Sequence, residues 1–212
     1  LLYFLTRTVG NEQSQKHSEI RVFNLADGSE KLLLTSEPDL LFNQLAISEK
    51  YLMISQSANG EDLAADFPIL FYNLQSGNFE DLMEISGSLP MIKGALAAWS
   101  EQGPKRFPET IKIFDFASGL SWPMAIKSAQ PSDFYLSDEY LVWVDPSEPA
   151  TTFPAVYLSS LDDGHTLTLI TGSQERLPQF PQVWDGGLSF GMVKDPYSAS
   201  ASSLICTIPL SA

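Results

Sequence analysis

The chain has 212 residues, of which 44% are hydrophobic and 18% are charged, and its 26 acidic and 12 basic side chains give a formal net charge of −14. This composition is typical of a packed globular protein and excludes a disordered or fibrous chain. The negative charge would repel a phosphate backbone, so nucleic acid is excluded as a partner. Because no run of about 18 apolar residues is present, the sequence predicts no direct membrane insertion.

The first predicted elements are a strand at 1–9 and a hairpin at 20–34, whose turn carries Gly28. Three similar hairpins follow along the chain. Their turn glycines are Gly77, Gly119 and Gly164, so the turn recurs at intervals of 49, 42 and 45 residues. Glycine suits these turns because it adopts positive φ without steric cost. The recurrence predicts a repeat architecture with one such hairpin in each unit.

The repeats predict 18 strands in five units. The units span residues 1–38, 39–87, 88–129, 130–174 and 175–212. Within them, strands or hairpins are predicted at 1–9, 19–36, 41–48, 51–55, 69–85, 89–93, 95–100, 110–126, 133–137, 140–144, 155–171, 180–184, 187–193 and 203–208. A second match supports the repeat, since 47–54 and 136–143 align without gaps and both contain a Ser-acidic-x-Tyr-Leu turn. Pro123 falls in the last strand of its unit, which predicts that this strand lies at the edge of its sheet.

A period of about 40–50 residues with four short antiparallel strands per repeat indicates an all-β fold, a β-propeller with four-stranded antiparallel blades. Residues 1–212 are predicted to form a single propeller domain with about five visible repeats. The first and last units have only three strands each. We therefore expect a fragment of a ring of six to eight blades, and the alternative is a five-bladed ring with imperfect terminal blades.

These motifs resemble the repeats of TolB-like, or WD40-like, β-propellers. The resemblance rests on the Ser-acidic-x-Tyr-Leu turn and on hairpins such as 20–28, which reads Ile-x-Val-x-x-Leu-x-Asp-Gly. It implies a bacterial scaffold for binding, located in the periplasm, on the cell surface or outside the cell. The Gly-His and Trp-Asp dipeptides of strict WD40 repeats are absent from the sequence, so the partners of that family are not carried over.

Long, irregular loops are predicted on one face of the propeller, where the second strand of each unit ends. Variable loops on a rigid scaffold are the usual place for binding, and the tight glycine turns are expected on the opposite, non-binding face. Polar residues occupy equivalent positions at the ends of the second strands. These candidate binding residues are Arg7, Gln56, Glu101, Asp145 and, with an offset of one residue, Asp195. For the last two the simpler interpretation is that Asp before Pro initiates a turn.

The sequence predicts no catalytic residues, no metal site and no cofactor. The Asp27-Gly28 turn lacks the spacing of a calcium loop. His17 and His165 fall in loops expected on opposite faces, which argues against a zinc site. No Gly-x-Ser-x-Gly motif is present. Trp99 and Trp143 occupy equivalent strand positions, where packing between blades is expected in place of sugar stacking.

The sequence therefore favours a non-catalytic scaffold or binding module that engages a protein partner or multi-subunit assembly through its loop-rich face. The alternative is the propeller domain of an enzyme, either glycan-processing or the substrate-gating domain of a serine peptidase. A glycan ligand stays open under either hypothesis.

Overall fold

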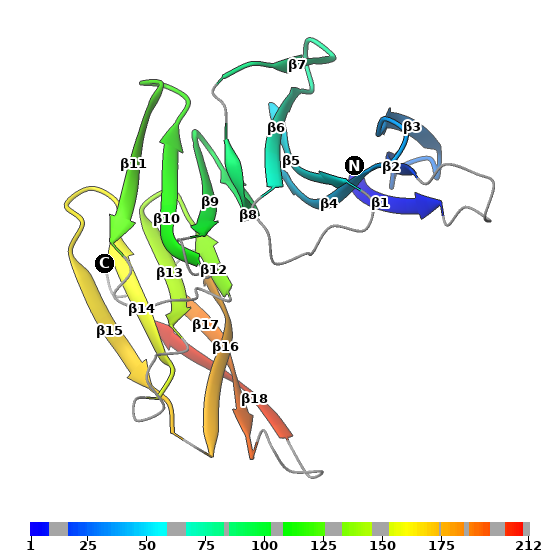
Figure 1. Cartoon of the computed structure of the whole chain (residues 1–212). Helices are drawn as coiled ribbons and strands as arrows, with labels where there is room; N and C mark the ends of the chain where they lie inside the picture. Colours follow the sequence, from blue (N-terminus) through cyan, green and yellow to red (C-terminus); the bar gives the residue numbers. More distant parts are fainter. Residues whose placement is uncertain are drawn as a thin grey trace. The chain divides into compact units, whose positions relative to one another are not determined.

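The computed structural model describes residues 1–8, 17–58, 67–82, 85–102, 108–125, 133–145, 153–173, 175–184, 187–195 and 202–209. Across these ranges the chain forms 18 β-strands and no helix, which confirms the all-β class (Figure 1). Accordingly, no helix in the described ranges could cross a membrane. The chain divides into two compact units, Leu1–Pro90 and Met91–Ala212, which are described separately. The assignment of all 212 residues to one domain stays a prediction.

The first unit contains the strands of the first two repeats. They are β1 (Leu2–Thr8), β2 (His17–Phe23), β3 (Glu30–Thr35), β4 (Leu40–Ile47), β5 (Tyr51–Ala58), β6 (Phe67–Asn73) and β7 (Asn78–Glu80). Within each repeat, neighbours in the chain pair as antiparallel neighbours in the sheet. The first sheet has three strands, in the order β1-β2-β3.

The prediction of a full strand up to residue 85 is wrong, because β7 ends at Glu80. The next strand, β8 (Ser86–Lys93), begins earlier than predicted and pairs with the start of β6, where Phe67 faces Gly87. The N–H of Ile69 donates to the carbonyl of Ile85 at 3.0 Å, and the Ile85 side chain is 6% exposed. Burial of this isoleucine brings the segment after the hairpin against the edge that a longer β7 would occupy.

The second unit continues with the predicted order of strands. They are β9 (Leu96–Gln102), β10 (Pro108–Asp115), β11 (Leu120–Ala125), β12 (Asp133–Leu136), β13 (Tyr140–Asp145), β14 (Ala155–Ser160), β15 (Thr166–Thr171), β16 (Arg176–Trp184), β17 (Gly187–Lys194) and β18 (Ser202–Pro209). β12–β15 form a four-stranded sheet and β16–β18 a three-stranded one. β11, which contains Pro123, lies at the end of its sheet, so the edge position predicted from the proline is confirmed.

The four glycine turns have the same conformation. The φ angles of Gly28, Gly77, Gly119 and Gly164 are 72°, 70°, 69° and 70°, which confirms the predicted positive φ. In each turn the glycine N–H donates to the carbonyl four residues earlier, at 2.8–3.1 Å. The hairpin turn is therefore a local structure that the sequence encodes four times.

Neighbouring sheets pack face to face around an apolar core in each unit. In the first unit the core joins β2 to β4–β6 and consists of Ile20, Phe42, Leu52, Ile54 and Tyr72. In the second unit a core joins β13 and β14 to β17 and consists of Val142, Val144, Val156, Leu158, Leu188, Phe190 and Met192. Burial of both faces of a sheet explains why Tyr51–Ile54 in β5 and Tyr140–Val144 in β13 are continuous apolar runs, without the alternation of a half-exposed strand.

Candidate functional site

Hydrogen bonds between turns define two opposite edges of each sheet. The turn after the first strand of a repeat bonds to the turn after the third, for example from Leu74 N–H to the Lys50 carbonyl at 2.8 Å and from Leu161 N–H to the Glu139 carbonyl at 2.9 Å. We call this side the turn edge. The strands β1, β5, β9, β13 and β17 run away from it and end at the other side, which we call the loop edge.

All five predicted binding residues lie at the end of a strand that reaches the loop edge. Arg7 lies in β1 and Gln56 in β5, both in the first unit, whereas Glu101 lies in β9, Asp145 ends β13 and Asp195 follows β17. The side chain of Arg7 falls outside the described part of the structure. Gln56 is half-buried and faces Phe42, next to a bulge in β4. The five positions therefore correspond to one another in the repeats, and their role in binding stays a prediction.

Glu101 is held by two side chains of its own sheet. Trp99, two residues earlier in β9, is 3% exposed and donates its indole N–H to Oε1 of Glu101 at 3.3 Å. Lys112 faces Trp99 across the strand pair, and its Nζ lies 3.6 Å from Oε2 of Glu101. Residues two apart on one strand, and residues directly opposite each other, share a face of the sheet. The carboxylate therefore accepts from a buried donor and pairs with a cation at the same time.

The next sheet has the same arrangement with different residues. Trp143 corresponds to Trp99, Asp145 to Glu101, and Tyr157 faces Trp143 where Lys112 faces Trp99. The rings of Trp143 and Tyr157 stack at 5.4 Å between centroids, with an angle of 18° between their planes. Burial raises the pKa of the Tyr157 hydroxyl, and the nearby carboxylate of Asp145 raises it further. Tyr157 therefore remains neutral where the neighbouring sheet has a cation.

The two sheets differ in how the buried indole is satisfied. Trp143 is 3% exposed, and its Nε1 has no hydrogen-bond partner among the described residues. Asp145, itself 3% exposed, has a side chain one methylene shorter than that of Glu101. A buried donor without an acceptor costs about 1–3 kcal/mol. Trp143, Asp145 and Tyr157 thus place a donor, a carboxylate and an aromatic face together near the loop edge.

Asp195 has a different environment from the other acidic residues. Its φ is 51°, and its N–H donates to the carbonyl of Glu175 at 2.8 Å. The Nζ of Lys194 lies 4.0 Å from its Oδ2. Asp tolerates this left-handed conformation better than most residues, so the simpler interpretation as a turn residue has structural support.

Sequence reasoning treated the tryptophans and the strand-end carboxylates separately. It missed the Trp-x-Glu and Trp-x-Asp spacing that links them, and it missed the cross-strand partners Lys112 and Tyr157. The spacing is visible in the sequence at 99–101 and 143–145 and could have been found from the alternation of a strand. Among the described residues, no group of three or more His, Cys, Asp or Glu side chains is arranged to hold a metal ion.

Comparison with known proteins defines the fold class. No protein-family model matches the sequence, and no curated protein matches it. Several solved structures are similar. TolB from Acinetobacter baumannii is 14% identical with a TM-score of 0.57, over 89% of this chain and 48% of that one. A prolyl endopeptidase is 15% identical with a TM-score of 0.63, over 96% of this chain and 32% of that one. Oligogalacturonate lyase from Vibrio parahaemolyticus is 12% identical with a TM-score of 0.61, over 92% and 56%.

The chain therefore has an all-β, propeller-type fold, and the resemblance to TolB-like propellers is confirmed at the level of structure. It spans only 32–56% of the length of these three proteins. At 12–15% identity the similarity establishes the fold alone. One of the three proteins is TolB, and the other two are named as enzymes.

Proposed function

We propose that this chain is a non-catalytic β-propeller module that binds a protein partner, or a larger assembly, through the loop edge of its sheets. The observation that carries the proposal is that Glu101 and Asp195, at the ends of two strands that reach the loop edge, keep side chains that are 36% and 40% exposed. In the sheet of β12–β15, Trp143 and Asp145 are buried at the corresponding positions. The exposed carboxylates are accessible to the basic side chains of a partner, whereas the buried pair is not.

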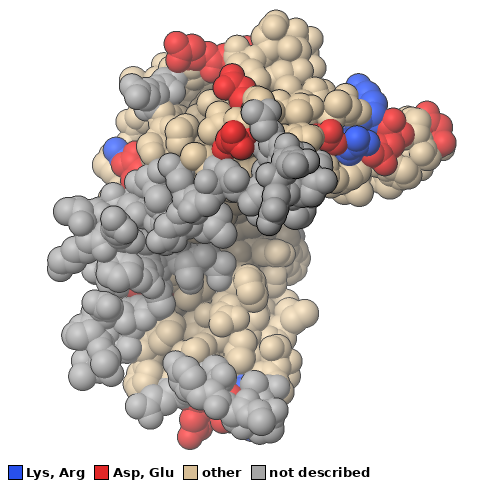
Figure 2. Space-filling model, turned by 45° about the vertical axis from the view of Figure 1, so that its right-hand side comes forward, with Lys and Arg blue, Asp and Glu red and all other residues tan. Residues whose placement is uncertain are grey.

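The composition of this edge supports a protein partner with basic side chains. The chain carries a net charge of −14, and acidic side chains are more widespread than basic ones on the face shown in Figure 2. Charge complementarity of this kind increases the association rate and selects between partners. In addition we propose a periplasmic, cell-surface or secreted location, which fractionation of native material would test.

The alternative function is that of a propeller domain within an enzyme, glycan-processing or substrate-gating. The similarity to a prolyl endopeptidase and to oligogalacturonate lyase supports it. This alternative predicts turnover of glycan or peptide substrates by the native protein. Loss of such turnover in Glu101→Gln or Asp145→Asn variants would overturn the binding-module proposal.

The proposal is tested by recovery of complexes from native material with matched charge variants. The loop-edge variant combines Glu101→Gln with Asp195→Asn, and the control combines Glu49→Gln with Asp27→Asn on the turn edge, where both side chains are exposed. Each removes two negative charges, and Glu101→Gln keeps an oxygen acceptor for Trp99. We expect the loop-edge variant alone to lose the partner, by about tenfold in recovery, which corresponds to roughly 1.4 kcal/mol. An equal loss in both variants would show that the loop edge is not the interface.

A further inference from the structure

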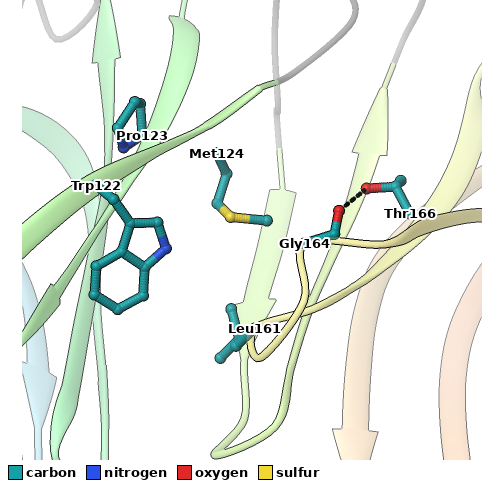
Figure 3. A pocket seen from close by; sticks show the side chains of 6 residues that line it. All are labelled: Trp122, Pro123, Met124, Leu161, Gly164 and Thr166. Carbon is teal, nitrogen blue, oxygen red and sulfur yellow. Dashed lines mark hydrogen bonds between the residues drawn. The ribbon is translucent and has the colours of Figure 1, made fainter.

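A groove lies in the second unit, on the outer side of two neighbouring sheets. Its lining residues come from the edge strand β11, from the turn between β14 and β15, and from the first residue of β15: Trp122, Pro123, Met124, Leu161, Gly164 and Thr166. The groove has a volume of about 310 Å³. Figure 3 shows Trp122 on one side and the Gly164–Thr166 turn on the other, with Met124 and Leu161 between them.

The walls of this groove are mainly apolar. Met124 is 8% exposed, whereas Trp122 and Leu161 are half-buried, so these two side chains keep surface open to a ligand. Gly164 contributes no side chain, and a Cβ built on it would meet nothing within 4 Å. Thr166 donates to Ser159 Oγ at 3.0 Å and contacts the Gly164 carbonyl at 3.5 Å. The polar end of the groove is therefore already bonded internally, and the open surface is the aromatic and aliphatic part.

The turn that forms one wall of the groove carries acidic side chains, and we call this turn the rim. Asp162 and Asp163 lie between Leu161 and Gly164 on the same turn, and both are exposed. The N–H of His165 donates to Oδ1 of Asp163 at 2.9 Å, and this bond lowers the pKa of the carboxyl group. The turn is also bonded to Glu139, whose exposed side chain adds a third carboxylate near this end. On the other side, Lys112 faces Pro123 across the strand pair but lies 3.6 Å from Glu101.

We propose that this groove docks an extended peptide segment of a protein partner, in which an apolar side chain is flanked by Lys or Arg. The apolar side chain would insert between Trp122 and Leu161, and the cationic side chains would contact Asp162 and Asp163. One wall of the groove, the turn between β14 and β15, belongs to the turn edge, for which the sequence predicts no binding, and none of the lining residues is a candidate residue of the loop edge.

Two observations favour a peptide over a small molecule. The volume of about 310 Å³ is near the lower limit for small-molecule sites, which leaves room for about one large side chain. The carboxylates lie outside the apolar part, along the turn, so only a ligand longer than the groove could use both. Recognition by one buried anchor with complementary charges around it is common in peptide docking.

The first experiment selects binders from a displayed library of random peptides on the immobilised chain. We expect enriched peptides to carry an apolar residue next to Lys or Arg. Recovery of these peptides should fall about tenfold with Leu161→Ser, which removes the anchor contact, and with Asp162→Lys, which reverses the rim charge. Asp162→Lys changes an exposed side chain and tests the charge without disturbing the apolar core.

The equivalent turn of the first unit provides matched controls. Leu25 and Ala26 occupy the positions of Leu161 and Asp162 in the Gly28 turn, and both are exposed. Leu25→Ser and Ala26→Lys should leave peptide recovery unchanged, and circular dichroism checks that all four variants are folded. Absence of any enrichment would overturn the proposal, as would binders whose recovery is insensitive to Leu161→Ser and Asp162→Lys. Because none of these variants touches the loop edge, failure here is distinguishable from failure of the proposed function.

Discussion

Shortening Glu101 to aspartate should convert its sheet to the arrangement found around Asp145. One methylene moves the carboxylate back by about 1.5 Å, so the 3.3 Å bond from the Trp99 indole would exceed hydrogen-bond distance. A buried donor left without its charged acceptor costs about 1.5–3 kcal/mol. The Glu101 side chain is 36% exposed and Lys112 can follow the carboxylate, so we reduce the expected loss to about 1 kcal/mol.

Urea unfolding followed by tryptophan fluorescence measures this loss. With a slope of about 2 kcal/mol per molar urea, the midpoint of Glu101→Asp should fall by about 0.5 M. A double-mutant cycle with Trp99→Phe separates the hydrogen bond from other effects, because the aspartate substitution should cost little once the indole N–H is absent. A coupling energy below about 0.3 kcal/mol would refute the assigned role of this bond.

Three further predictions concern the scaffold. Gln44→Ala should destabilise the chain by about 1–2 kcal/mol in urea unfolding. The reason is that the Gln44 Oε1 accepts the N–H of Leu89 at 2.7 Å and holds this residue at a strained φ of 53°. An unchanged urea midpoint would contradict this prediction. Gly172→Ala should lower the free energy of unfolding by about 1–3 kcal/mol in thermal unfolding, since the added Cβ would lie 2.6 Å from the Arg176 carbonyl oxygen and 3.0 Å from the Pro154 carbonyl oxygen. A variant as stable as the wild type would show that the segment can move to make room. The hydrogen bond from the Asn73 amide is the main cause of the lowered pKa of Glu80. The ionised Glu80 carboxylate should therefore stabilise the fold fully above pH 4.5, which is the ordinary pKa of this group, and this stabilisation should disappear as the pH falls through the lowered pKa. Glu80→Gln should therefore be less stable than wild type at neutral pH and equally stable in acid, and a pH-independent difference would contradict this.

Part of the binding site could be predicted from the sequence because strand periodicity is regular. The ends of β5, β9 and β13 follow from the repeat, so the repeat alone assigns equivalent positions to Gln56, Glu101 and Asp145. The environments of those residues could not be assigned. Glu101 reaches a buried indole and Asp145 is itself buried, and this difference depends on one methylene and on which residue faces the tryptophan across the sheet.

The strand order of this protein is determined by its sequence, and so are its four hairpin turns. Both depend on local physics, namely the alternation of side chains along a strand and the positive φ that glycine accepts at Gly28 and its equivalents. Only the tertiary structure decided that β7 ends at Glu80 and that β8 takes part of its place, because pairing at a sheet edge is a competition between segments. The groove beside Trp122 has the same origin: its two walls are about 40 residues apart in the chain, and only packing between sheets brings them together.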